Sequence, residues 1–341
     1  MMEFEKRLPI PKEVKEKYPI SKTALENKRK VDEEIKKVFL GESKKLILIV
    51  GPCSADNKRA VLDYVVKLKK VYEKVSDKLI IIPRIYTSKP RTTGDGYKGM
   101  LFQPNPNEAP DTFKGILLTR ALHAKVLSET GMPTADELLY PADYRYVDDL
   151  LSYVTVGARS VENQEHRLVA SGVSAPVGMK NPTSGDLSVM LNAVDCARNP
   201  HTFIYRGWQV HTTGNPFAHM ILRGFVDRDN NSVPNYDYKD LTNLYVMAKC
   251  RLQKNISLVV DANHSNSNKN PFEQPRICKE VLNSCKKFSD IKTMLKGFMI
   301  ESYLEDGCQK VGGDVYGKSI TDACLGFEKT ERLIYDLAEM L

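Results

Sequence analysis

The sequence contains no long hydrophobic run. None of its segments reaches the length of about 20 apolar residues that a helix needs to cross a bilayer. The first residues, MMEFEKRLPIPKEVKEKYP, lack the apolar stretch of a secretory signal. We therefore expect a cytoplasmic protein with no membrane role.

Cysteines are few and their number is odd: the seven are widely scattered along the chain, which argues against a secreted disulfide framework. The net charge is +7, but no arginine-rich tract and no aromatic-basic RNA motif is present. Basic residues alternate with acidic ones along expected helices such as residues 28–37, as on an ordinary solvated surface. We expect no nucleic-acid partner.

The Gly-rich GxGxxG turn of dinucleotide-binding sheets does not follow the first expected strand, and no internal repeat is visible. Instead, eight short apolar segments alternate with helix-length segments and no break in composition separates them. This pattern predicts an α/β fold with a single (β/α)8 TIM barrel. The expected strands are Leu46–Val50, Leu79–Ile82, Pro133–Leu139, Tyr153–Val156, Pro176–Met179, His201–Tyr205, Ser257–Val260 and Gly297–Ile300.

Residues 1–45 are expected to form an N-terminal arm followed by an amphipathic helix that ends at Gly41. This helix is a candidate for a contact between subunits or for a cap on the barrel. The catalytic barrel is then expected over residues 46–341. A Gly- and Asn-rich stretch at about 206–235 is too long for a simple loop, so we expect a β-hairpin insertion after the sixth strand.

A cluster of basic residues follows the second expected strand. The sequence LIIIPRIYTSKPRTT brings Arg84, Lys89 and Arg91 within eight residues, next to hydroxyl groups such as that of Thr92. Like charges repel, so a fold that gathers these three at a strand end favours an anionic ligand such as a phosphate or carboxylate. An isolated cluster of this kind is often only a solvated loop, and the remaining strand ends decide between the two interpretations.

Four potential metal ligands stand just after strands of the expected barrel, where side chains converge at one mouth. They are Cys53 in GPCS, His264 in DANHS, Glu301 in IES and Asp322 in TDAC. One buried Cys or His is usually structural, but a thiolate, an imidazole and two carboxylates together form a competent set of ligands. We expect one divalent metal ion, with Mn, Fe, Co and Zn all compatible.

Further cations are expected at the same mouth: Arg159 in GARSVENQ, Lys180 in GMKNPTSGD and Arg223 in the insertion. Together with Arg84, Lys89 and Arg91 they make six basic side chains, enough to hold two anionic groups or two phosphorylated substrates. The small residues Gly157 and Ala158 would let backbone N–H groups approach an anion. Glu137, at the end of the third strand, is expected to orient a cation or water or to offset charge.

The motifs GPCS, KPRTT, GARSVENQEHR, GMKNPTSGD, ILRG, DANHSNSNK, ES and YGKSITDACLGFEKT occur here in an order that resembles type I 3-deoxy-D-arabino-heptulosonate 7-phosphate (DAHP) synthase, the class of enteric bacteria and yeast. The resemblance begins near Ile35 and continues to the C-terminus. It implies a transferase of aromatic amino-acid biosynthesis that condenses phosphoenolpyruvate with erythrose 4-phosphate and releases phosphate. It also implies a homodimer or homotetramer.

The resemblance also implies roles for individual residues. It assigns the metal to Cys53, His264, Glu301 and Asp322. For the reaction itself, we expect catalytic roles for Lys89, Glu137, His264 and Asp322. Lys89 is the candidate proton donor, and the base that activates water stays open between Glu137 and a metal-bound hydroxide. The resemblance assigns substrate binding to Arg84, Lys89, Arg91, Thr92, Arg159, Lys180 and Arg223. Gly157 and Ala158 are expected there as well, because these small residues let backbone N–H groups approach an anion.

Two other functions remain as alternatives. The related 3-deoxy-D-manno-octulosonate 8-phosphate synthase shares the chemistry, although its loop carries a KxNRSS-type sequence where this chain has KPRTT. A non-catalytic anion-binding barrel would tolerate the basic mouth but has no need of four metal ligands. A class II aldolase is disfavoured because it relies on several His ligands, and only His264 stands at a convincing strand end.

Two features predict departures in regulation. The N-terminal arm is shorter than in the relatives, where it helps to form an aromatic amino-acid site, and Pro141, Tyr144 and Arg145 around Ser174 do not look like the usual lining of that site. We expect a weak or altered response to phenylalanine and tyrosine. Cys324 follows Asp322 closely, so an inactivating disulfide with Cys53 and an inert buried thiol are both open.

Overall fold

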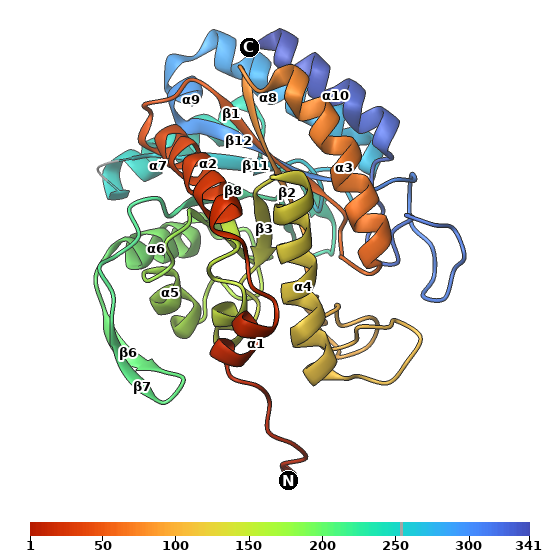
Figure 1. Cartoon of the computed structure of the whole chain (residues 1–341). Coiled ribbons are helices and arrows are strands. Elements are labelled where there is room, and N and C mark those ends of the chain that lie inside the picture. Colours follow the sequence, from red (N-terminus) through yellow and green to blue (C-terminus); the bar gives the residue numbers. More distant parts are fainter. Residues whose placement is uncertain (253–254) are drawn as a thin grey trace.

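The computed structural model describes residues 1–252 and 255–341 (Figure 1). Its helices, strands and 3-10 helices (η) are α1 (Pro11–Lys17), α2 (Lys22–Leu40), β1 (Leu46–Gly51), α3 (Lys58–Val75), β2 (Leu79–Pro83), α4 (Thr112–Thr130), β3 (Thr134–Glu137), η1 (Pro141–Tyr146), β4 (Leu151–Val156), α5 (Gln164–Ala170), β5 (Val177–Lys180), α6 (Leu187–Arg198), β6 (Thr202–Tyr205), β7 (Trp208–His211), β8 (His219–Leu222), β9 (Phe225–Val226), β10 (Ser232–Val233), α7 (Tyr238–Leu252), β11 (Leu258–Asp261), η2 (Pro271–Glu273), α8 (Gln274–Lys287), α9 (Ser289–Met294), β12 (Leu295–Glu301) and α10 (Phe327–Met340).

Eight parallel strands form the barrel, which confirms the predicted fold class. Their order around the sheet is β2-β1-β12-β11-β8-β5-β4-β3. The ladder is regular beside β1, where Leu46 pairs with Leu79 and Ile47 pairs with Gly297. The seam between β2 and β3 is much weaker: a single parallel bridge joins Arg84 to Ala135 there. This seam lies next to the basic loop that the sequence singled out.

The sixth predicted strand is wrong. Residues 202–205 form β6, which pairs antiparallel with β7 in a separate hairpin outside the barrel, and this hairpin stands away from the barrel in Figure 1. The sixth barrel strand is β8, and it pairs with β5 and β11. The reason is that β6 finds its partner locally, three residues along the chain. A short second hairpin, β9 with β10, follows β8 within the predicted insertion.

The inside of the barrel is apolar at its N-terminal end. Side chains alternate along the strands, so Ile47 and Ile49 of β1 point inward while their neighbours pack against the outer helices. Helix α2 covers this end with Phe39, whose ring stacks on that of His219 at 4.2 Å. His219 is fully buried, and Tyr153 Oη lies 2.6 Å from its Nε2. The predicted amphipathic helix therefore closes the bottom of its own barrel.

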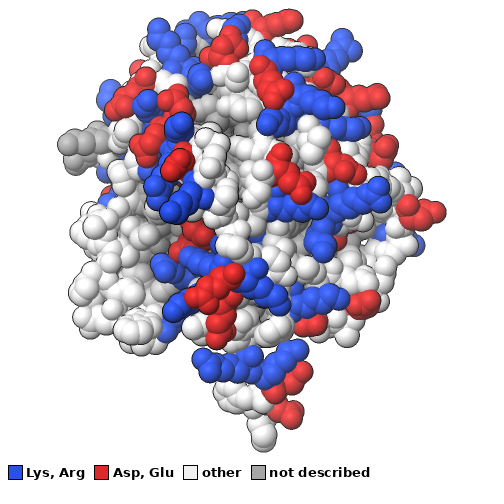
Figure 2. Space-filling view, viewed as in Figure 1, with Lys and Arg blue, Asp and Glu red and all other residues white. Residues whose placement is uncertain are grey.

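Charge on the outer helices is mixed. Figure 2 shows Lys and Arg side chains interspersed with Asp and Glu over the face that carries α2 and α3. Salt bridges one turn apart, such as that between Lys37 and Glu34 on α2, are part of this pattern. Across residues 1–252 and 255–341, no helix is both long enough and apolar enough to cross a membrane.

Replacing His219 with Gln should make stability less sensitive to acid. Burial lowers the pKa of His219 to about 3, whereas an unfolded His titrates near 6.5. The unfolded chain thus binds the extra proton between these values, and stability is lost as the pH falls from 6.5 towards 3, by up to about 1.4 kcal/mol per unit. Urea unfolding at pH 7.5 and 4.5 should show a smaller loss for the variant than for the wild type.

The matched control is His211→Gln on the exposed strand β7. It should lose as much stability between the two pH values as the wild-type chain. Equal losses of stability in the wild type and both variants would contradict the lowered pKa of His219.

Candidate active site

The carboxyl ends of the strands surround a single polar pocket with a cavity volume of about 150 Å³. Residues from almost every predicted strand end meet here, together with several that the sequence did not single out. The lining residues are Cys53, Arg84, Tyr86, Lys89, Pro90, Arg91, Glu137, Gly157, Ala158, Arg159, Lys180, Thr183, Arg223, His264, Lys269, Thr321 and Asp322.

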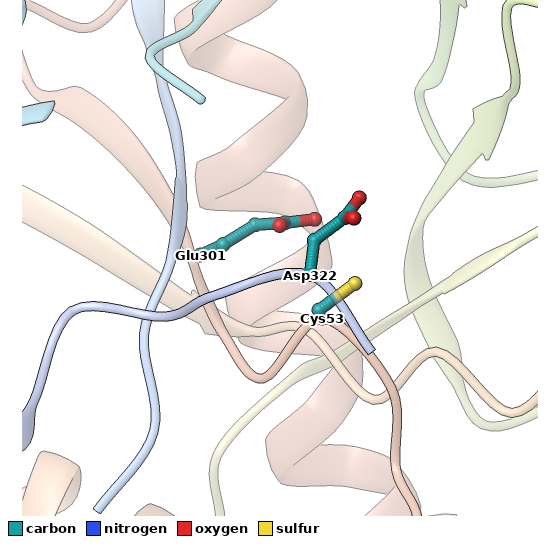
Figure 3. A group of neighbouring side chains, drawn as sticks. All are labelled: Cys53, Glu301 and Asp322. Carbon is teal, nitrogen blue, oxygen red and sulfur yellow. The ribbon is translucent and has the colours of Figure 1, made fainter. Parts of the chain in front are cut away.

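Three of the four predicted metal ligands form one group. Cys53 follows β1, Glu301 ends β12 and Asp322 lies in the loop before α10, yet ligand atoms of the three all lie within 4.8 Å of one another. Figure 3 shows the thiol and both carboxylates turned toward a common point. Strand pairing explains part of this convergence, because Gly51 of β1 is in register with Glu301 of β12. The structure thus contains a possible Cys, Glu and Asp metal site.

The fourth predicted ligand, His264, stands beside this group. Its Nε2 lies 3.8 Å from Glu301 Oε1, and its Nδ1 lies 2.9 Å from Asp261 Oδ2. Burial lowers the pKa of His264 although Asp261 acts against this, so the ring tends toward the neutral form that binds metals. A histidine that binds a metal through one ring nitrogen usually contacts a carboxylate through the other, which fixes the orientation of the ring.

The donor chemistry fits a divalent transition metal. A sulfur and two carboxylates within 4.8 Å match the spacing of ligands around one ion with bonds of about 2.0–2.3 Å. Burial and the neighbouring Glu301 raise the pKa of Cys53. The thiolate is therefore disfavoured without a metal ion even though Lys89 lies beside it, whereas a bound metal deprotonates a coordinating thiol. These residues fit such an ion.

Arg84 connects the possible metal site to the basic half of the pocket. It is 1% exposed; Nη2 donates to Glu301 Oε1 at 2.9 Å and Nε donates to the carbonyl of Pro52. Tyr86 lies against the guanidinium group, 3.8 Å from ring centre to carbon. Nη1 is buried and has no hydrogen-bond partner among the residues that the structure describes. One donor of this arginine is therefore free for a ligand in the pocket.

The other predicted cations lie around the same space. Lys89 Nζ donates to the carbonyl of Cys53 at 2.8 Å and lies 3.2 Å from its sulfur. Lys180 is buried and donates to Asp261 at 2.6 Å, while Arg223 donates to Ser265 at 3.1 Å. Arg223 directly follows strand β8, so its place does not depend on the insertion.

Some predicted contacts turn out differently. Thr92 is exposed and does not line the pocket. A Cβ on Gly157 would overlap Oε1 of Glu137, so this glycine is needed because the carboxylate lies against its backbone. Arg91 does line the pocket, and its Nε donates to the carbonyl of Tyr97 at 2.7 Å.

The sequence reasoning missed two charged residues. Asp261 is fully buried and joins Lys180 to His264, which holds the pKa of this carboxyl well below its usual range despite its burial. Its position three residues before His264, at the end of β11, was the available signal. Lys269 lines the pocket 3.4 Å from Asp322 and has left-handed backbone (φ 58°), which its sequence did not reveal.

The model of the DAHP synthetase I family matches residues 17–334. The chain belongs to this family. Two relatives from Escherichia coli (strain K12) are named phospho-2-dehydro-3-deoxyheptonate aldolase: the Trp-sensitive enzyme is 35% identical over 97% of this chain and 94% of its own length. The Phe-sensitive enzyme is 34% identical over 98% and 94%, respectively.

Solved structures agree with this membership of the DAHP synthetase I family. A structure of phospho-2-dehydro-3-deoxyheptonate aldolase from Francisella tularensis SCHU S4 superposes with a TM-score of 0.93 at 32% identity. The match covers 100% of this chain and 98% of that one. The agreement therefore extends over the whole barrel and includes the strand ends that form the pocket.

Adding a divalent transition metal to metal-free protein should raise its melting temperature. An ion at 100 times its Kd stabilises the folded state by about 2.7 kcal/mol. Cys53→Ala and Asp322→Asn should lose most of this gain because each removes one donor from the group of three. Calorimetry with Mn²⁺, and again after EDTA, would measure the shift.

Cys250→Ala is the control, because this cysteine is exposed and lies on α7. Its melting temperature should rise on adding the metal by as much as that of the wild type. A metal shift that survives in both site variants would place the ion elsewhere.

Proposed function

We propose that the chain is a metal-dependent DAHP synthase, which condenses phosphoenolpyruvate with erythrose 4-phosphate to give DAHP and phosphate. Membership of the DAHP synthetase I family and the names of the relatives support this reaction. The observation that carries it furthest is the juxtaposition of a metal-ligand group with a dense set of cations in one pocket. An anion-binding barrel without catalysis would need only the second of these.

The basic half of the pocket is the proposed binding site for the two anionic substrates. Phosphoenolpyruvate carries a carboxylate and a phosphate, and Arg84, Lys180 and Arg223 offer fixed donors from three different strand ends. Arg84 Nη1 is already buried and unpaired within the described residues, so a substrate oxygen there restores a missing hydrogen bond. Arg159 completes the proposed phosphoenolpyruvate site, and Arg91 would contact the phosphate of erythrose 4-phosphate.

Cys53, His264, Glu301 and Asp322 are the proposed metal ligands, with Mn, Fe, Co or Zn as the ion. A divalent ion held there supplies Lewis acidity toward the aldehyde oxygen of erythrose 4-phosphate. The protein contributes the orientation of these ligands. In particular, Asp261 holds His264 from behind, and Lys269 lies beside Asp322 on the solvent side.

Lys89 is the proposed proton donor. Burial alone would lower its pKa, but Cys53 and Glu301 more than offset this and raise the pKa. Its ammonium group, 3.2 Å from the Cys53 sulfur, can therefore protonate the alkoxide that forms when C3 of phosphoenolpyruvate attacks the aldehyde carbon. Glu137 lines the same pocket and is the proposed base for the water that adds to C2, after which the C2–O bond to phosphate breaks.

We also propose that the enzyme is cytoplasmic and works as a homodimer or homotetramer. The N-terminal arm is the proposed subunit contact, since Phe4 is 97% exposed and Ile10 is 40% exposed. The structure uses α2 to close the barrel, so the segment before α1 is the part of the arm that remains available.

Phosphate release from phosphoenolpyruvate tests the proposed reaction. The metal-loaded protein should turn over with erythrose 4-phosphate and lose this activity in EDTA. Arabinose 5-phosphate should not replace the aldehyde; turnover with it would favour the octulosonate 8-phosphate synthase instead. If neither aldehyde supports turnover, the result would favour a non-catalytic anion-binding barrel.

The matched variants for this assay lie on one loop. Lys89→Met should lower kcat by about 100-fold or more, the usual range for losing a general acid. Lys98→Met, whose side chain is exposed on the same loop, should remain close to the wild type. Similar losses of kcat in both variants would show that Lys89 is not the proton donor.

Phenylalanine and tyrosine are expected to inhibit the enzyme weakly or not at all. Ser174 is exposed and Tyr144 forms a side-chain hydrogen bond with it, while Tyr205 donates to the carbonyl of Pro141 at 2.6 Å. The neighbours of Ser174 thus include large tyrosine side chains in place of the small residues expected around an aromatic amino-acid site. Initial rates with each amino acid at micromolar concentration would check this, and strong inhibition by either one would refute it.

A further inference from the structure

A polar cluster lies buried directly behind the pocket, between β2, β3 and α4, and the proposed mechanism does not use it. Its members are Thr87, His123, Thr134 and Asp136, of which none is more than 4% exposed. A carboxylate so deeply buried must have good hydrogen-bond partners, since an unpaired polar group in such a place costs free energy. The identity of these partners shows what the cluster holds together.

Asp136 accepts hydrogen bonds from both sides of the barrel seam. Its Oδ1 accepts from the backbone N–H of Thr87 at 3.0 Å and from the backbone N–H of Glu137 at 2.7 Å. Its Oδ2 accepts from the hydroxyl of Thr87 at 2.6 Å. One carboxylate therefore connects Thr87, four residues after the end of β2, with Glu137, the last residue of β3.

His123 fixes this carboxylate from the helix side. Its Nε2 lies 3.2 Å from Asp136 Oδ2, and its Nδ1 lies 3.0 Å from the hydroxyl of Thr134. Because Oδ2 accepts from Thr87 and offers no proton, the contact is a hydrogen bond only if Nε2 carries a hydrogen. The side chain of Asp136 is thus held between α4 and the loop after β2.

Backbone pairing between β2 and β3 is sparse at the seam. A single bridge, Arg84 with Ala135, and the bond from Ile85 N to the carbonyl of Ala135 at 2.8 Å join the two strands. A cavity of about 30 Å³, lined by Thr87, Asp136 and others, adjoins the cluster. The hydrogen bonds from Thr87 to Asp136 therefore add a side-chain connection where the backbone ladder between β2 and β3 is sparse.

Both segments held by Asp136 carry proposed catalytic groups. Thr87 begins the loop two residues before Lys89, and its carbonyl accepts from Leu101 N at 3.0 Å across the base of that loop. The second segment is the end of β3, which places Glu137 in the lining of the same pocket as Lys89. A shift of Thr87 toward the cavity would therefore move Lys89 relative to Glu137.

We propose that Asp136, held by His123, is a positioning residue that fixes the loop bearing Lys89 relative to Glu137. Its effect on turnover rests on the proposed function, while its effect on the loop does not. Misplacing a reacting group by about 1 Å can cost about 100-fold in rate. The binding of phosphoenolpyruvate should suffer less, because Lys180 and Arg223 come from other strand ends and Arg84, just after β2, is held separately by Glu301.

The test compares Asp136→Ala with Asp136→Asn in two measurements. Hydrogen–deuterium exchange should be faster in residues 87–101 of Asp136→Ala. Its kcat should fall about 10- to 100-fold with the KM for phosphoenolpyruvate changed much less. Asp136→Asn should restore much of the exchange protection and of kcat, because the Asn oxygen still accepts from the two backbone N–H groups and its NH₂ can donate to the Thr87 hydroxyl.

Two further variants separate positioning from loss of stability. Thr87→Val keeps the backbone bond to Asp136 but loses the hydroxyl bond, so its effects should be intermediate; it also serves if Asp136→Ala does not fold. Thr130→Ala removes buried hydrogen bonds at the far end of α4. It should lower the melting temperature without changing kcat or the exchange of residues 87–101.

Exchange that stays at the wild-type rate in folded Asp136→Ala and Thr87→Val would overturn the proposal. So would a fall in kcat that Thr130→Ala reproduces at equal stability. If the wild-type chain does not turn over erythrose 4-phosphate at all, the proposed function fails, and the exchange measurement still decides whether Asp136 holds the loop.

Discussion

The buried ion pair between Arg84 and Glu301 is the contact on which the rest of the pocket depends. Both side chains are at most 1% exposed and their charged atoms are 2.9 Å apart. Removing either charge from water costs several kcal/mol, and leaving one without the other typically costs about 3–5 kcal/mol. Burial by itself would raise the pKa of Glu301, but Arg84, His264 and Lys89 together lower it. Arg84 above all, with Lys89, thus favours the ionised form of this carboxylate.

This pair joins the two halves of the proposed chemistry, because Glu301 belongs to the metal-ligand group while Arg84 faces the basic side. Asp261 repeats the arrangement on the next strand, where it contacts Lys180 on one side and His264 on the other. A carboxylate shared in this way fixes the distance between a cation and a proposed metal ligand. The strand order accounts for it: β12, which ends at Glu301, lies between β1 and β11, and Arg84 follows the strand beyond β1.

The sequence was sufficient for the barrel and for most of the pocket because both depend on short-range patterns. Apolar runs such as LIII in β2 identify strands, and polar residues just after them must meet at one mouth. The sheet to which a strand belongs is a long-range property. Residues 202–205 have a good strand pattern but pair with β7, while the true sixth strand, HMIL, is hidden in a Gly- and Asn-rich stretch.

The buried cluster behind the pocket could not be predicted for the same reason. His123 stands in the mostly apolar helix α4 and Asp136 precedes the more conspicuous Glu137, so neither has a local signature. Only the closure of the barrel brings β3 beside the loop after β2. That closure has a single backbone bridge, and side-chain hydrogen bonds to Asp136 supply the missing connection. The place where the ladder is weakest is therefore also where a polar side chain has most influence on the geometry of the mouth.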